Sequence, residues 1–124
     1  MQRINRLLIN LLSSSLEESK HFYTTLFDFK AEFDSDWFVN LISESRSLEL
    51  GLIHPSSDIV PDGLPSAAQG FYLTFVVEDV EATYQLAQSK GYDITAAPHD
   101  TFYGQRRMLL RAPDGVVVDV SSPM

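Results

Sequence analysis

Two acidic side chains attract attention because each lies in a strand-like run that ends one half of an internal repeat. Glu49 lies in SLELGLI, and Asp119 lies in GVVVDVSS. Two carboxylates that face one pocket can share a proton or bind a cation. The competing interpretation is that one or both accept hydrogen bonds from an arginine such as Arg6 or Arg106, because a buried acid needs a partner. The sequence leaves both interpretations open.

The elements that must position these acids occur twice and in the same order. The run RINRLLINLLSSSLEESKHFY near the N-terminus is matched, 64 positions later, by AQGFYLTFVVEDVEATYQL. In each copy an alternating run precedes a helix start, and three strand-like runs follow. A repeat of this period indicates two similar supersecondary units that pack on each other to bury their apolar faces. We therefore expect the two acids to meet near a pseudo-twofold axis, where a pocket can form.

The first half is expected to form four strands and a helix. Its periodicity predicts a strand over 4–12, a helix over 16–27, and strands over 29–33, 37–42 and 48–54. Alternation in the first strand places Leu8 and Asn10 on the face opposite Leu11. Ser14 and Ser15 stand three residues before Glu17 and Glu18, which is the spacing of a capping box.

The second half is expected to repeat this plan. It is predicted to hold a strand over 71–77, a helix from an Asp79 cap to about Lys90, and strands over 92–97, 105–111 and 116–121. Gly91 follows the helix, and Gly115 ends the turn APDG at a position that requires a positive φ. The segment 55–69 is rich in Pro, Ser and Gly, so we interpret it as a linker. The sequence therefore predicts a single α+β domain of two paired βαβββ modules, 1–54 and 70–124, whose curved sheets form a cleft.

Composition and charge narrow the classes of function. The chain has 124 residues, 44% hydrophobic and 21% charged, which suits one globular domain. It has no cysteine and no apolar run long enough to span a membrane, so we expect a cytoplasmic protein without membrane partners. The formal net charge of -8 makes nucleic acid a poor partner. The same charge favours a cationic small molecule, although many acidic domains carry it for solubility alone.

Three segments give the chain a resemblance to a known family. SLEESKHFYTTLFDF, VVEDVEATYQLAQSKG and YGQRRMLLRAPDGVVVDV together resemble the vicinal oxygen chelate superfamily, which includes glyoxalase I, extradiol dioxygenases and the bleomycin- and fosfomycin-resistance proteins. The last segment is the most specific, because a YGQR string, a strand and a PDG turn follow in that order. Asp28 stands where the family usually has Gly, and Ala112 stands where Asp commonly precedes Pro-Asp-Gly. The resemblance implies a cleft that is often completed across a dimer, so we expect a homodimer.

The resemblance also indicates where metal ligands would stand. Metal-using members place His, Gln or Glu early on the first strand of each half, and Glu late on the last strand. Counting from the two helix starts, the resemblance assigns the early positions to Leu8 and Tyr72, and the late ones to Glu49 and Asp119. Leucine has no donor atom and tyrosine is an uncommon ligand, so two carboxylates remain, which cannot form a specific divalent site. The spacing of the three histidines fits no metal motif, and we expect neither a metal nor another cofactor.

The candidate ligand-binding residues are those expected to line the cleft. They are Leu8, Asn10, Trp37, Glu49, Tyr72, Tyr103, Arg106 and Asp119. Two choices stay open. Either Trp37 or Phe38 faces the cleft. Alternation places Arg106 and Arg107 on opposite faces of their strand, so only one of them can face the cleft. An arginine there could hold an anionic or carbonyl group, or it could form a salt bridge.

These observations favour metal-independent binding of a small organic ligand, cationic or aromatic in character, as in the bleomycin-resistance branch. The alternative is a glyoxalase-type lyase, isomerase or dioxygenase, with a degenerate or displaced metal site or with acid-base work by Glu49 and Asp119. A third hypothesis is an interaction module whose cleft is filled by side chains. The sequence does not decide whether the protein is an enzyme.

Overall fold

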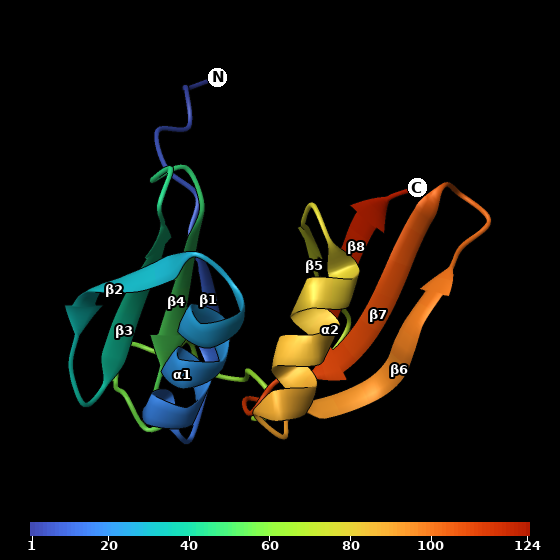
Figure 1. Ribbon diagram of the computed structural model, residues 1–124. Helices are drawn as coiled ribbons and strands as arrows, with labels where there is room; N and C mark the ends of the chain where they lie inside the picture. Colours follow the sequence, from blue (N-terminus) through green and yellow to red (C-terminus); the bar gives the residue numbers. More distant parts are fainter. The chain divides into compact units, whose positions relative to one another are not determined.

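The computed structural model describes all residues from Met1 to Met124 and divides the chain into two compact units. Unit 1 is Met1–Ser66, and unit 2 is Ala67–Met124. Each unit has a strand, a helix and then three further strands, with the four strands in one curved sheet (Figure 1). The predicted α+β fold of two βαβββ modules is confirmed.

Unit 1 contains five elements. They are β1 (Ile9–Leu12), α1 (Leu16–Leu26), β2 (Phe29–Asp34), β3 (Phe38–Ser43) and β4 (Glu49–Ile53). The sheet order is β1-β4-β3-β2, in which β1 runs parallel to β4 and the other pairs are antiparallel. The parallel pair follows from the fold, because α1 carries the chain over one face of the sheet before β2 begins.

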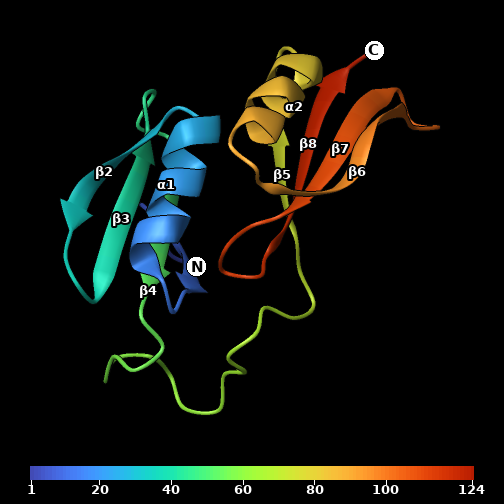
Figure 2. The ribbon, with the colours of Figure 1, turned by 60° about the horizontal axis from the view of Figure 1, so that its bottom comes forward.

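Unit 2 repeats this topology. Its elements are β5 (Leu73–Val76), α2 (Val80–Ser89), β6 (Asp93–Asp100), β7 (Gln105–Arg111) and β8 (Val117–Pro123), and its sheet order is β5-β8-β7-β6. Residues 54–72, between β4 and β5, contain no helix or strand (Figure 2). Neither helix of the chain is long and apolar enough to cross a membrane.

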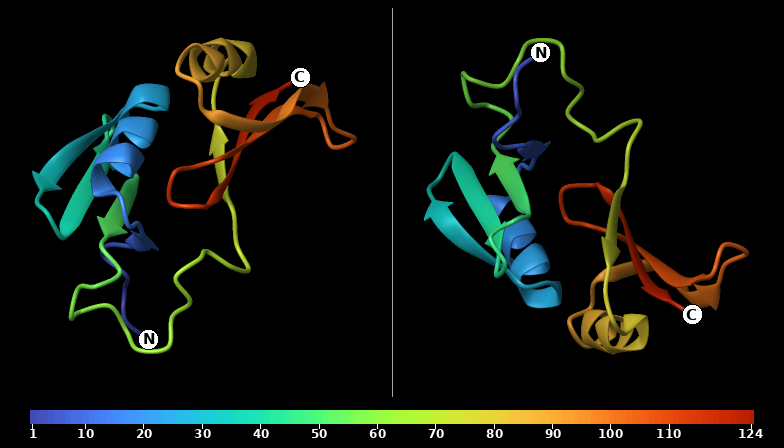
Figure 3. Two further views of the ribbon diagram at one scale, coloured as in Figure 1. Left: turned by 90° about the horizontal axis from the view of Figure 1, so that it is seen from below. Right: turned by 90° about the horizontal axis from the view of Figure 1, so that it is seen from above.

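Each helix covers one face of its own sheet (Figure 3). In unit 1, the fully buried Phe22 and Tyr23 of α1 lie among buried strand residues that alternate along β3 and β4. Those strand residues are Val39, Leu41, Leu50 and Leu52. In unit 2, the buried Val80, Thr83 and Ala87 of α2 face Met108, Leu110, Val118 and Val120. Within its own unit, the opposite side of each sheet has no helix over it, and we call it the helix-free face.

The first strand is shorter than predicted. The sequence pattern predicts a strand over 4–12, but β1 begins at Ile9. An alternating pattern forms a strand only where a partner strand is present. The partner of β1 is β4, which begins at Glu49, and the first residue pair between the two strands is Ile9 with Leu50. The segment before β1 runs past the end of the sheet (Figure 1), and its Ile4 and Leu7 side chains are exposed.

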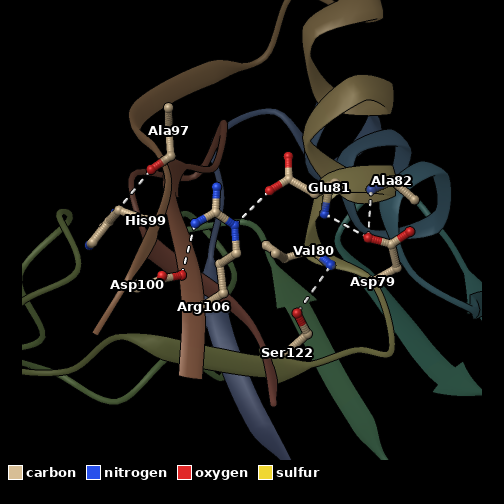
Figure 4. Close-up of polar contacts among 9 residues, drawn as sticks. All are labelled: Asp79, Val80, Glu81, Ala82, Ala97, His99, Asp100, Arg106 and Ser122. Carbon is tan, nitrogen blue, oxygen red and sulfur yellow. Dashed lines mark hydrogen bonds and ion pairs between the residues drawn. The ribbon is translucent and has the colours of Figure 1, made fainter. Parts of the chain in front are cut away.

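The two helix starts differ in their chemistry. Ser15 is the N-cap of α1, but its side chain makes no capping hydrogen bond, so the predicted capping box does not form. The Ser13 hydroxyl instead donates to the Ser15 carbonyl at 2.9 Å. Asp79 caps α2 as predicted, and its carboxylate accepts from the N–H groups of Glu81 at 3.0 Å and Ala82 at 3.4 Å (Figure 4).

Two glycines have the backbone conformation that the sequence predicts. Gly91 follows α2 with φ 71°, and Gly115 ends the β7–β8 turn with φ 89°. The Gly115 N–H donates to the Ala112 carbonyl at 2.9 Å, which closes that turn. Residues with a Cβ disfavour this left-handed region, so both positions require glycine.

The capping difference yields a first prediction. Replacing Asp79 with Ala should lower the free energy of unfolding by about 1 kcal/mol, because two N–H groups at the start of α2 lose their acceptor. Ser15→Ala is the matched control and should have a much smaller effect, since that hydroxyl caps nothing. Urea unfolding followed by circular dichroism measures both variants, and equal losses would contradict the assigned caps.

Candidate functional site

Glu49 lies on the helix-free face of unit 1 and is paired with an arginine. Its carboxylate accepts from Arg6 Nε at 2.8 Å and from Arg6 Nη2 at 2.6 Å, and Asn40 donates to it at 3.2 Å. The Glu49 side chain is 13% exposed. The hydrogen bonds from Arg6 hold the pKa of Glu49 below its usual value, although partial burial acts in the opposite direction. The interpretation that an arginine partners this acid is therefore confirmed for Arg6.

Asp119 lies on the helix-free face of unit 2 and is almost completely buried, with 3% exposure. It accepts hydrogen bonds from the Ser121 hydroxyl at 2.7 Å, the Thr74 hydroxyl at 3.0 Å and Arg107 Nε at 3.3 Å. Arg107 Nη2 lies 3.2 Å from the second carboxylate oxygen. Burial raises the pKa of Asp119, but the hydrogen bonds from Arg107, Ser121 and Thr74 outweigh it and bring the pKa below its usual value.

The two acids do not occupy equivalent places in the repeat. In unit 1, Ile9 pairs with Leu50, and in unit 2 the matching Leu73 pairs with Val118. Gly51 is therefore the counterpart of Asp119, and Glu49 stands two residues earlier on its strand. Both acids lie on the predicted face. The expectation that the repeat places them symmetrically is wrong, because Glu49 lies two residues before the position that corresponds to Asp119.

Arg106 and Arg107 lie on opposite faces of β7, as alternation predicts. Arg106 does not lie beside Asp119: its guanidinium reaches Glu81 of α2 at 2.7 Å and Asp100 of β6 at 2.8 Å, on the helix side of the sheet (Figure 4). Arg107 holds the place on the helix-free face that we assigned to Arg106. Met108 and Leu110 are buried in the core and share the parity of Arg106. Alternation therefore places Arg106 on the core side of β7 and Arg107 on the helix-free face.

Asn10 fills the space above Gly51. A Cβ built on Gly51 would overlap the Asn10 side-chain oxygen and would lie 3.0 Å from the Phe38 ring. Gly51 is thus required by close packing, not by its backbone angles. Leu8 stands just before β1 and is half-buried.

Aromatic rings gather on each unit. In unit 1, Phe33, Trp37 and Phe38 pack together, with Trp37 and Phe38 ring centres 5.5 Å apart. Phe38 belongs to β3 and shares the parity of Asn40, whereas Trp37 lies in the turn before the strand. In unit 2, Phe102 and Tyr103 meet edge-on at 5.3 Å in the β6–β7 loop. Each unit therefore has aromatic rings as well as an acid–arginine pair, and the parity of Phe38 places its ring on the helix-free face of unit 1.

The residues present do not fit the metal site that the family resemblance implies. Leu8 offers no donor, and both carboxylates are already engaged by arginines that would compete with a cation. The structure gathers no group of three or more His, Cys, Asp or Glu side chains with a metal-binding arrangement. His99 Nδ1 donates to the Ala97 carbonyl, and His54 Nδ1 shares a hydrogen bond with the Ser56 hydroxyl.

The same contacts disfavour general acid–base catalysis by Glu49 and Asp119. A general acid or base functions best with a pKa near the working pH. Both pKa values are lowered instead, and both carboxylates are ionised partners of arginines. The arrangement suits fixed charge and hydrogen bonding better than proton transfer.

Unit 1 has two surface hollows that the sequence does not predict. One, of about 510 Å³, lies at the start of α1 and is lined by Ser14, Ser15, Leu16, Glu17, Asp34, Ser35, Asp36 and His54. Another, of about 360 Å³, lies between the end of α1 and the β3–β4 turn. Neither hollow contains a predicted ligand-binding residue.

The buried pair yields a second prediction. Arg107→Gln should lower the free energy of unfolding by about 2 kcal/mol, because Asp119 is left buried without its cation. Arg106→Gln should cost less, since water already screens its exposed ion pairs. Urea unfolding measures both. The double variant Arg107→Gln with Asp119→Asn is the control and should recover most of the loss, and equal losses for the two arginine variants would rule out the assigned roles.

A third prediction concerns pH. The pKa of Asp119 is lower in the folded protein than in the unfolded chain, so its contribution to stability is complete above about pH 5 and is lost as pH falls through the folded pKa. Stability should therefore decline from pH 5 toward pH 3. Asp119→Asn should show a shallower decline, with Glu49 supplying part of what remains. Urea midpoints across this range provide the measurement, and parallel curves for the two proteins would contradict it.

Comparisons with known proteins agree with this architecture. No curated protein matches the sequence. A glyoxalase-related enzyme from Fulvimarina pelagi has a similar structure, with a TM-score of 0.81 and 17% identity, over 96% of this chain and 88% of that one. A bleomycin resistance determinant encoded on a transposon gives 0.67 and 20%, over 97% and 98%. A fosfomycin resistance protein from Listeria monocytogenes gives 0.75 and 11%, over 99% and 96%.

Identities this low establish a shared fold and nothing finer. The sequence model of the Glyoxalase/Bleomycin resistance protein/Dioxygenase superfamily, however, matches residues 3–120, which is nearly the whole chain. The order of elements within each unit agrees with that match. The chain belongs to the glyoxalase/bleomycin resistance protein/dioxygenase superfamily.

Proposed function

We propose that the protein binds a small planar organic ligand on its helix-free sheet faces, without a metal and without turnover. The observation that carries this proposal is that each unit combines exposed aromatic rings with an acid–arginine pair whose carboxylate is already satisfied. Such a surface offers apolar contact and a few fixed polar groups, which is the usual composition of a small-molecule site.

The exposed aromatic surface supports the proposal. In unit 2, Tyr72 is 58% exposed, Tyr103 is 50% exposed and Phe102 is 99% exposed. Covering such rings with a flat ligand removes apolar area from water, which contributes roughly 25 cal/mol per Å². Tyrosine is well suited to this, because it presents an apolar ring and a hydroxyl that can orient a polar group.

The names of the structural relatives point in the same direction. Two of them are a bleomycin resistance determinant and a fosfomycin resistance protein, which are named for small organic compounds. The fold can therefore carry recognition of such compounds, although fold alone does not fix function.

A homodimer in the cytoplasm is part of the proposal. The segment before β1 carries exposed Ile4 and Leu7 with a strand-like alternation and no ladder partner within its own unit. Unpaired strand-like segments are ready partners for another chain. Light scattering coupled to gel filtration will give the mass in solution, and a monomer would remove this part of the proposal.

The fourth prediction tests binding with a neutral flat dye. Phenylnaphthylamine should bind and gain fluorescence, and treatment with EDTA should leave the affinity unchanged. Tyr72→Ala and Tyr103→Ala should each weaken binding, because they remove exposed aromatic surface. Tyr84→Ala is the matched control, since Tyr84 lies on α2 and its hydroxyl accepts from Gln88, and its affinity should equal that of the wild type.

Two results would contradict the proposal. Absence of dye binding would remove the ligand-binding function. Tight binding of one Ni²⁺, Zn²⁺, Mn²⁺ or Fe²⁺ ion per site in calorimetry would restore a metal-dependent activity despite the donor set described above.

A further inference from the structure

One cation on the helix-free face of unit 2 has donors to spare. Arg107 approaches Asp119 through Nε and Nη2, at 3.3 and 3.2 Å. A guanidinium carries five N–H groups in a fixed fork, so three of them are not directed at Asp119. The structure gives Arg107 no other hydrogen-bond partner, and its side chain is 22% exposed. Its outer edge therefore remains available.

The acid beneath this arginine is not available to a ligand. The Asp119 side chain is 5% exposed, and its oxygens accept from Thr74, Ser121 and Arg107. A molecule that approaches this face meets the guanidinium before the carboxylate. Asp119 thus fixes the orientation of Arg107, and the accessible charge on this part of the face is positive.

Two tyrosines interact electrostatically with the same cation. The pKa of Arg107 is raised chiefly by its hydrogen bond to Asp119, and further by the charge of Asp119 and by the phenol groups of Tyr103 and Tyr72. Both phenol rings are exposed, and Tyr103 also packs against Phe102. A guanidinium and exposed rings on one unit can offer a charged group and flat apolar surface to one ligand.

The arginine on the other side of β7 differs in this respect. Arg106 is held by two carboxylates, Glu81 and Asp100, so it has no comparable excess of positive charge. The chain as a whole carries -8, which repels anions from most of its surface. A local preference for an anion would therefore have to come from a specific group.

We propose that the ligand of unit 2 carries an anionic group, a carboxylate or a phosphate-like oxyanion, which accepts hydrogen bonds from Arg107 while the attached planar body lies against Tyr72 and Tyr103. This inference rests on the proposed ligand-binding function and names the class of ligand. It replaces the expectation of a cationic ligand for this face.

The test compares two dyes that share one ring system. Anilinonaphthalene sulfonate has a sulfonate that its neutral parent, phenylnaphthylamine, lacks. The wild-type protein at neutral pH should bind the sulfonate about tenfold more tightly than the parent, which is the scale of one hydrogen-bonded charge pair. Arg107→Gln should abolish this preference, and Arg107→Lys should keep part of it. Arg106→Gln removes the same charge from the opposite face of the same strand and should keep the full preference.

The double variant Arg107→Gln with Asp119→Asn keeps the test decisive, because it removes both buried partners if the single variant fails to fold. It should also lose the preference. Competition by naphthoate and by naphthyl phosphate then distinguishes carboxylate from phosphate ligands, and displacement by either supports the inference.

Three results would overturn the inference alone: equal affinity for the two dyes, a preference that survives Arg107→Gln, or failure of both competitors. In each case the neutral dye still binds, so the proposed function stands. If neither dye binds, the proposed function fails and the inference fails with it.

Discussion

A four-stranded sheet that is covered by a helix on one side only must divide its residues by alternation, and the rest of this structure depends on that division. Along β8, Val118 and Val120 enter the core, so Asp119 has to face the other way. The same rule sends Met108 into the core and Arg107 to the side of Asp119. The chemistry of each helix-free face is therefore fixed by the packing of the face behind it.

Alternation would leave Asp119 as a buried charge without a partner, which is among the most costly situations in a folded protein. Unit 2 avoids this with donors from three different strands: Thr74 on β5, Arg107 on β7 and Ser121 on β8 itself. Unit 1 satisfies Glu49 differently, with Arg6 from the segment before β1 and Asn40 from β3. The two solutions are not copies of each other, because the acids stand at different steps of the repeat.

The fold could be predicted from the sequence because its signals are local and occur twice. The Asp79 cap, Gly91 and Gly115 each act through neighbouring backbone, and the structure has all three as predicted. The start of β1 could not be predicted, because it depends on where β4 begins and not on the pattern of its own residues. The predicted cap at Ser15 also fails, because the Ser15 hydroxyl makes no capping hydrogen bond, and the Ser13 hydroxyl donates to the Ser15 carbonyl instead.

The candidate site is harder to predict, because which side chains form ion pairs or hydrogen bonds with each other depends on the folded structure. The sequence places Arg106 and Arg107 side by side, and only the identity of the core residues around them tells which one faces Asp119. The sequence pattern also suggests that Glu49 and Asp119 are equivalent positions of the repeat. The pairing of β1 with β4 and of β5 with β8 shows that Glu49 lies two residues before the counterpart of Asp119. Each face accordingly has its own set of contacts.

The two faces consequently present different charges to a ligand. On unit 1, Arg6 contacts both oxygens of Glu49 while its side chain remains 59% exposed, so water screens much of that pair. On unit 2 the acid is buried beneath its arginine, so its charge is shielded from solvent while the cation is accessible. Coulombic attraction grows where water is excluded, and a flat ligand that covers Tyr72 and Tyr103 would itself exclude water from Arg107. Aromatic contact and charge recognition would then reinforce each other at Arg107, whereas Arg106, bound to Glu81 and Asp100, gains nothing from such a ligand.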